Sequence, residues 1–77
     1  MNKERRAEIA RAIELMATAA EILEVCASEE SEYHDNMPES IQSGERGERA
    51  QAAVDALTEA ADALNEAMYR IQEVAES

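Results

Sequence analysis

The chain has little of what gives most folds their shape: no Trp, no Phe, one Pro, one Cys and two Gly among 77 residues. Its apolar residues are mainly Ala, Leu, Ile, Val and Met, a set typical of helix–helix packing and not of a β-sandwich core. A lone cysteine cannot form an internal disulfide, which favours a reducing cytoplasm as the location. A chain this short forms at most one small domain, residues 1–77.

Basic residues and long apolar runs are also scarce. Seven Lys and Arg against 18 Asp and Glu give a formal net charge of −11, and this charge repels nucleic acid and anionic membranes. The N-terminal stretch lacks the apolar segment of a signal peptide, and no apolar run approaches the ~20 residues needed to cross a bilayer. We therefore expect neither nucleic acid nor a membrane as a partner, although an acidic surface can imitate nucleic acid.

Two long stretches carry adjacent apolar rows at helical spacing. In residues 3–32 the rows are Ile9, Ile13, Met16, Ala20, Leu23 and Ala27, and beside them Ala12, Leu15, Ala19, Ile22 and Cys26. In residues 45–76 the main row is Ala50, Ala53, Leu57, Ala60, Leu64, Ala67, Ile71 and Val74, widened by Val54, Ala61, Met68 and Ala75. The pattern predicts an all-α fold: an antiparallel two-helix hairpin with helices 3–32 and 45–76 and a structured connecting loop over 33–44.

Each predicted helix has an apolar face wider than one partner helix can cover, and alanine-rich faces bury little area. We therefore predict a homodimer that forms a four-helix bundle about a two-fold axis. The alternative is a lone hairpin or a partly disordered chain. An antiparallel arrangement also corrects charges that oppose both helix dipoles, because it places acids beside bases: Glu29, Glu30 and Glu32 beside Arg46 and Arg49.

The stretch "YHDNMPESIQSGERGER", residues 33–49, holds both glycines, the proline and the histidine. We predict that Asn36 caps a short helical turn and that Ser43 caps the second long helix. Gly47 lies inside a predicted helix, where Gly costs about 1 kcal/mol relative to Ala. Its missing side chain therefore indicates a close approach by the Tyr33 ring, a partner backbone or a ligand.

The polar residues of this stretch predict a site for an anion or a nucleotide at one end of the bundle. Arg46 and Arg49 suit phosphate or carboxylate near a helix N-terminus, and Tyr33 suits stacking on a ring. The predicted ligand-binding residues are Tyr33, His34, Asn36, Gln42, Ser43, Arg46, Gly47 and Arg49. The alternative is a packed cap in which Tyr33 fills the core and the arginines form ion pairs.

Some residues of this sequence match catalytic motifs by type, but their positions or missing partners argue against catalysis. Glu30 and His34 share one side of a helix, but the second Glu-x-x-His pair of a di-iron site is absent. Glu59 and Asp62 resemble an acidic pair of the all-helical pyrophosphatases, but they fall on the predicted solvent side. Cys26 lies in an apolar row, where it should be buried and inert. We predict no enzymatic activity, no catalytic residue, no metal and no cofactor.

The run "NMPESIQSGERGERAQAAVDALTEAADAL", with its cores "DNMPES" and "GERGE", resembles a family of small acidic helical proteins of bacteriophages and prophages, over residues 30–65. The resemblance implies a phage accessory protein that acts in the host cytoplasm against a bacterial defence system. It identifies no ligand and transfers no catalytic residue.

Two non-enzymatic functions follow from the sequence. The basic island formed by Arg46 and Arg49 favours a protein that sequesters a small anionic, nucleotide-derived immune signal. The acidic row Asp55, Glu59, Asp62 and Glu66 favours an inhibitor that binds a host defence protein, as a mimic of nucleic acid. We favour sequestration, because a mimic does not need the tyrosine, amide and guanidinium chemistry of the middle stretch.

Overall fold

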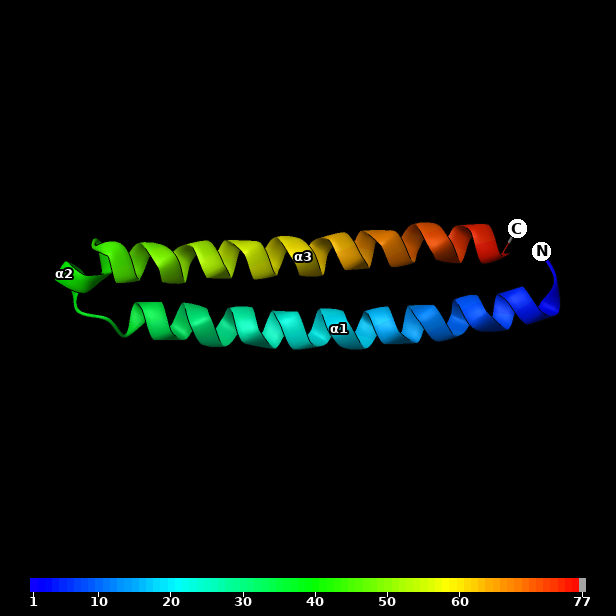
Figure 1. Ribbon diagram of the computed structural model, residues 1–77, viewed down its shortest axis with the longest axis horizontal. Coiled ribbons are helices and arrows are strands. Elements are labelled where there is room, and N and C mark those ends of the chain that lie inside the picture. The colour runs from blue at the N-terminus through cyan, green and yellow to red at the C-terminus, as the bar shows by residue number, and fades with distance from the viewer. Residues whose placement is uncertain (77) are drawn as a thin grey trace.

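Two long helices account for most of the chain, as their apolar periodicity predicts. The computed structural model describes residues 1–76 and contains α1 (Lys3–Asp35), α2 (Glu39–Gln42) and α3 (Glu45–Glu76). Figure 1 shows α1 and α3 side by side and running in opposite directions, with α2 at the turn and both termini at the other end. The molecule measures 58 × 15 × 13 Å. The all-α class is confirmed, and the elongated shape is consistent with the predicted hairpin.

The first helix is longer than predicted. It begins after Asn2, whose side-chain oxygen accepts a hydrogen bond from the Arg5 backbone N–H at 2.7 Å. It continues three residues past the predicted end at residue 32 and stops at Asp35. Pro38 explains the stop, because proline disfavours helical backbone at the residue before it and cannot donate a backbone hydrogen bond.

Asn36 and Ser43 end helices, whereas we predicted that they begin them. The Asn36 backbone N–H donates to the Glu32 carbonyl at 3.0 Å and closes α1. Ser43 closes α2, and its hydroxyl donates to the Glu39 carbonyl at 3.2 Å. Both predictions were wrong because Asn and Ser bond nearby backbone groups at either end of a helix. Pro38, with φ fixed at −57°, precedes the first turn of α2 instead.

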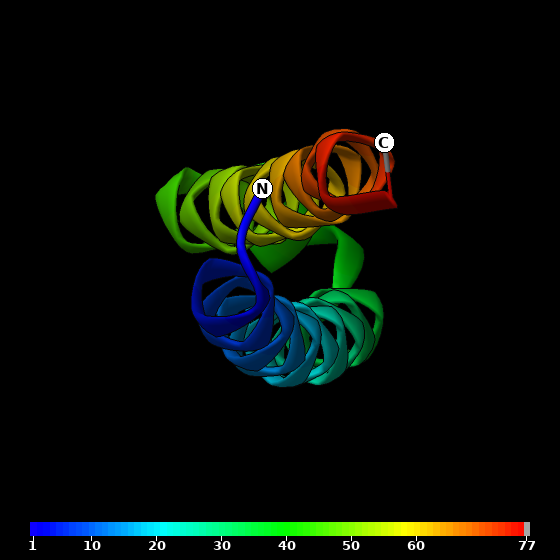
Figure 2. The ribbon, with the colours of Figure 1, turned by 90° about the vertical axis from the view of Figure 1, so that its right-hand side faces the viewer.

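The seam between α1 and α3 is made of very small residues. Within residues 1–76 the buried apolar side chains are all alanines, Ala20, Ala27, Ala50 and Ala61, and Gly47 is buried beside them. The larger residues of the inward rows flank this seam and are only half-buried: Ile9, Ile13, Met16, Leu23, Leu57, Leu64, Met68 and Ile71. Within the described residues the pair therefore encloses no large side chain. Figure 2 shows the two helices end-on, one beside the other.

The second apolar row of α1 lies outside this seam. Leu15 is 64% exposed and Ile22 57%, and Cys26 is exposed. Our prediction that Cys26 is buried is therefore wrong for the single chain. The reason is geometric: contact with one neighbouring helix covers one stripe of a helix, and the other stripe stays open.

The helix pair has two different faces, assigned from the rotation of 100° per residue along each helix. We call one the apolar face, formed by Ala12, Leu15, Ala19, Ile22 and Cys26 of α1 and Ala53, Ala56, Ala60, Ala63 and Ala67 of α3. We call the opposite one the polar face, formed by Glu21, Glu24 and Ser28 of α1 and Thr58, Asp62 and Asn65 of α3. On the polar face the Asn65 amide donates to the Glu24 carboxylate at 3.3 Å across the pair.

None of the helices in the described part of the chain combines the length and the apolar content that a membrane span requires.

Candidate functional site

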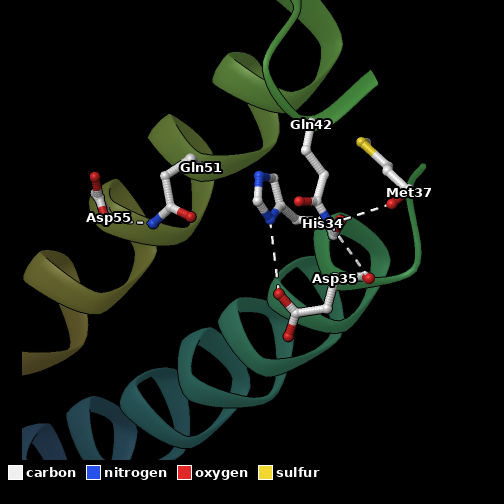
Figure 3. A network of polar contacts seen from close by, with 6 residues as sticks. All are labelled: His34, Asp35, Met37, Gln42, Gln51 and Asp55. Carbon is white, nitrogen blue, oxygen red and sulfur yellow. Dashed lines mark hydrogen bonds and ion pairs between the residues drawn. The ribbon is translucent and has the colours of Figure 1, made fainter. Parts of the chain in front are cut away.

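The corner between α1 and α3 is held together by Gln42. Its side-chain nitrogen donates to the backbone carbonyls of His34 at 3.1 Å, Asp35 at 3.3 Å and Met37 at 3.1 Å (Figure 3). The last carbonyls of a helix have no partner within the helix, so this amide satisfies the end of α1. Gln42 therefore ties α2 to α1, a structural role that we did not predict for it.

Gly47 is where α3 passes against α2. A Cβ atom on Gly47 would overlap the Gln42 carbonyl group and Cα. The predicted close approach is therefore present, but it comes from the Gln42 backbone of the same chain and not from the Tyr33 ring, a partner or a ligand. Only a residue without a side chain lets α3 begin this close to α2.

His34 also lies in this corner and is mostly covered, with 19% of its side chain exposed. Its Nδ1 atom lies 3.7 Å from an Asp35 carboxylate oxygen, as Figure 3 shows. Five of the eight predicted ligand-binding residues thus make contacts that shape the corner itself: His34, Asn36, Gln42, Ser43 and Gly47.

The other three predicted residues come together around one hollow. Tyr33, Arg46 and Arg49 line a hollow of about 240 Å³ with Glu30 and Ala50. An Arg46 Nη atom donates to the Tyr33 hydroxyl at 3.0 Å, which joins α3 to α1. Tyr33 is 47% exposed, so its ring borders solvent and does not fill the core. The hollow opens on the same side of the pair as the apolar face.

The charges around this hollow are balanced. Arg49 forms an ion pair with Glu45 of its own helix at 2.5 Å, rather than with the acids of α1 that the alternative interpretation paired with it. Glu30 of α1 also lines the hollow, so Glu30 and Glu45 offset the charges of Arg46 and Arg49. The Arg49–Glu45 pair is exposed, and exposed pairs four residues apart contribute only about 0.3–0.5 kcal/mol. An incoming anion can therefore take the place of Glu45 at small cost.

Sequence reasoning missed two residues of the hollow, Glu30 and Ala50. The sequence does contain a signal for each of these two residues. Glu30 precedes Tyr33 by one helical turn, and Ala50 follows Arg46 by one turn, so each shares a side of its helix with a predicted residue. Within residues 1–76 no group of three His, Cys, Asp or Glu side chains is placed to hold a metal ion.

Comparisons with known proteins give no relative: no protein family, curated protein or solved structure matches this chain. The resemblance to bacteriophage proteins therefore stays a prediction.

Proposed function

We propose that the chain is a non-catalytic binding module that holds a small anionic ligand at the corner of a homodimeric four-helix bundle. One observation carries this proposal: Tyr33 from α1 meets Arg46 from α3 at 3.0 Å, beside Arg49, around an open hollow. Guanidinium groups bind phosphate and carboxylate through paired hydrogen bonds. A tyrosine ring next to them offers a surface for a base or another planar ring.

The size of the hollow supports a ligand that is only partly covered by one chain. Its volume of about 240 Å³ is below the roughly 300–1,000 Å³ of pockets that enclose a drug-sized molecule. A planar ring with one or two phosphates matches the chemistry of the lining residues. The narrower role, sequestration of a nucleotide-derived immune signal by a phage protein, rests on the sequence resemblance of residues 30–65 alone.

The homodimer is supported by the large apolar side chains that stay exposed in the single chain. The buried apolar residues of the described chain are alanines, while Leu15 and Ile22 stand more than half exposed. A core of this kind contributes little hydrophobic free energy, because alanine buries little area. A second copy covers the open row, and we expect a particle of about 17 kDa, twice the chain mass of 8.5 kDa.

A second function has its own support. The acidic row Asp55, Glu59, Asp62 and Glu66 is exposed along α3, which suits an inhibitor that binds a basic surface of a host defence protein. Charge reversal at Asp55, Asp62 and Glu66 should abolish activity in that case and leave it intact if the corner is the site.

The corner site is tested by calorimetry with three probes: adenosine monophosphate, adenosine and inorganic phosphate. We expect the monophosphate to bind best, because it offers both a ring and an anion. Arg46→Ala and Arg49→Ala should each weaken its binding by about 2–5 kcal/mol, and Tyr33→Ala by about 1–3 kcal/mol.

Lys3→Ala and Arg5→Ala are the controls, because these basic residues lie at the far end of the molecule and should leave binding unchanged. Equal loss at the two ends would show a general charge effect and not a site. Failure of all three probes to bind rejects a nucleotide-like ligand.

A further inference from the structure

The apolar face consists of a ridge beside a groove. On α1 the large side chains Leu15 and Ile22 project from it, 64% and 57% exposed. On α3 every residue of the face is alanine. A hollow of about 300 Å³ lies at one end of this alanine row, lined by Ala63, Ala67 and Ile71 together with the Arg70–Glu66 ion pair. The face thus carries both a projecting strip and a recess that can receive one.

The positions of the ridge and the groove along the long axis of the molecule can be compared through residues of α1 and α3 that line the same hollow. Ala12 lines a hollow with Ile71 and Val74 near the termini, and Tyr33 lines another with Arg46 and Arg49 near the corner. Both helices rise by 1.5 Å per residue. The ridge is therefore level with the groove, pair by pair: Leu15 with Ala67, Ile22 with Ala60, and Cys26 with Ala56.

Two symmetric arrangements can pair this face with a second copy. If the two-fold axis runs along the helices, heights are preserved, and Leu15 lies on the partner's Ala67 while Ile22 lies on the partner's Ala60. If the axis runs across the helices, α1 lies on α1 in reverse, and Leu15 meets the partner's Ile22. The alanine rows then face each other.

Packing selects the first arrangement. Protein interiors fill space to a density of about 0.74, and large residues pack best opposite small ones. With the axis along the helices, each ridge fills the partner's groove. With the axis across them, ridge on ridge holds the layers apart on the α1 side and leaves a gap between the alanine rows.

The charges at the ends of the face select the same arrangement. With the axis along the helices, Glu30 and Tyr33 approach the partner's Arg49. With the axis across them, Glu30 approaches the partner's Glu8, and by symmetry Glu8 approaches the partner's Glu30, so like charges meet at both ends of the α1 side.

We propose that the apolar face docks on the same face of a second copy about a two-fold axis parallel to the helices, so that both corners lie at one end. The uncharged part of this face runs from Ala12 to Cys26, about 21 Å along α1 at a rise of 1.5 Å per residue, and the approach of Glu30 to the partner's Arg49 extends the interface toward the corner. The inference rests on the homodimer proposed above. It also completes the candidate site, because each hollow is then bordered by Arg49 of the partner subunit as well as its own.

The interface is tested by comparing Leu15→Glu with Val25→Glu in sedimentation equilibrium. Val25 is 58% exposed, similar to Leu15, but its helical position places it on the outer side of α1, beyond the apolar face. We expect the wild type and Val25→Glu at about 17 kDa and Leu15→Glu at 8.5 kDa. Equal masses for the two variants would overturn the proposed interface. A wild type of 8.5 kDa at every concentration would overturn the homodimer itself.

The orientation is tested with the natural Cys26 as one half of a disulfide. Ala56→Cys places a second thiol opposite the partner's Cys26 in the proposed arrangement, whereas Ala12→Cys does so in the reverse one. A disulfide needs Cα atoms about 4.4–6.8 Å apart. We expect Ala56→Cys alone to give a covalent dimer on mild oxidation, and we expect none from Ala56→Cys combined with Cys26→Ser. A covalent dimer from Ala12→Cys, or none from Ala56→Cys, overturns the orientation while leaving the dimer in place.

Discussion

The apolar face and the polar face are built from the same two helices, yet they have opposite chemistry. The polar face carries Glu21, Glu24 and Asp62, and the Asn65–Glu24 hydrogen bond crosses it. The residues of the apolar face are all uncharged. The central stretch of this side, over Ala12–Cys26 and Ala53–Ala67, therefore carries none of the net charge of −11. Two copies that meet through that side bring few acids together, so a strongly acidic chain can still self-associate.

The largest effect is expected where the two helices are joined, because both faces depend on that junction. Gly47→Ala forces a Cβ atom into the Gln42 backbone, and backbone cannot move aside as a flexible side chain can. We expect a loss of about 3 kcal/mol or more in the free energy of unfolding, measured by urea denaturation. Ala52→Gly, at an exposed position five residues further along α3, is the control and should cost only about 1 kcal/mol. A smaller loss at Gly47 than at Ala52 would contradict the close approach.

A smaller effect separates the apolar face from ordinary solvent-exposed surface. In a single chain Leu15→Ala should change stability by less than about 0.5 kcal/mol, since the residue is exposed. In the proposed dimer it should cost about 2 kcal/mol per copy, at the low end for a buried leucine. Urea melts at two protein concentrations measure this difference, because dimer stability depends on concentration. Val25→Ala is the matched control, and an equal small change in both variants would argue against a covered face.

The smallest effect is expected on the polar face. Asn65→Ala removes the hydrogen bond to Glu24, which is 3.3 Å long and exposed. Such surface bonds compete with water, so we expect a change within about 0.5 kcal/mol at any protein concentration. Thermal melts followed by circular dichroism are sufficient to detect a larger change. A loss above 1 kcal/mol would mean that the polar face, too, takes part in an interface.

The sequence predicts the two long helices well, but it does not predict which face of α1 packs against α3. The apolar rows recur over many turns, so the two long helices could be predicted from periodicity alone. Which row of α1 faces α3 could not, because the row containing Ala20 and the row containing Leu15 both satisfy the same spacing. The row that faces α3 is the one that lets the two backbones approach closely. The alanines and Gly47 that lie in the seam determine this distance.

The corner shows the same limit at the level of single residues. Gly47 indicated a close approach, but the identity of the neighbour depends on where α2 folds, which the sequence pattern does not specify. Gln42 has side-chain groups that could bind a ligand, yet its amide donates to two carbonyls at the end of α1, those of His34 and Asp35, and to the Met37 carbonyl in the turn that follows. Tyr33, Arg46 and Arg49 do converge, because each sits on the side of its helix that borders the same hollow.

Both termini lie at one end of the rod and the corner lies at the other. In the proposed dimer all four termini share one pole and both hollows share the opposite pole, up to 58 Å away. Such a dimer has two chemically different ends, whereas a bundle in which the second copy is reversed has two identical ends. A label or surface linker attached at either terminus would therefore lie at the opposite end of the dimer from both hollows and would block neither of them.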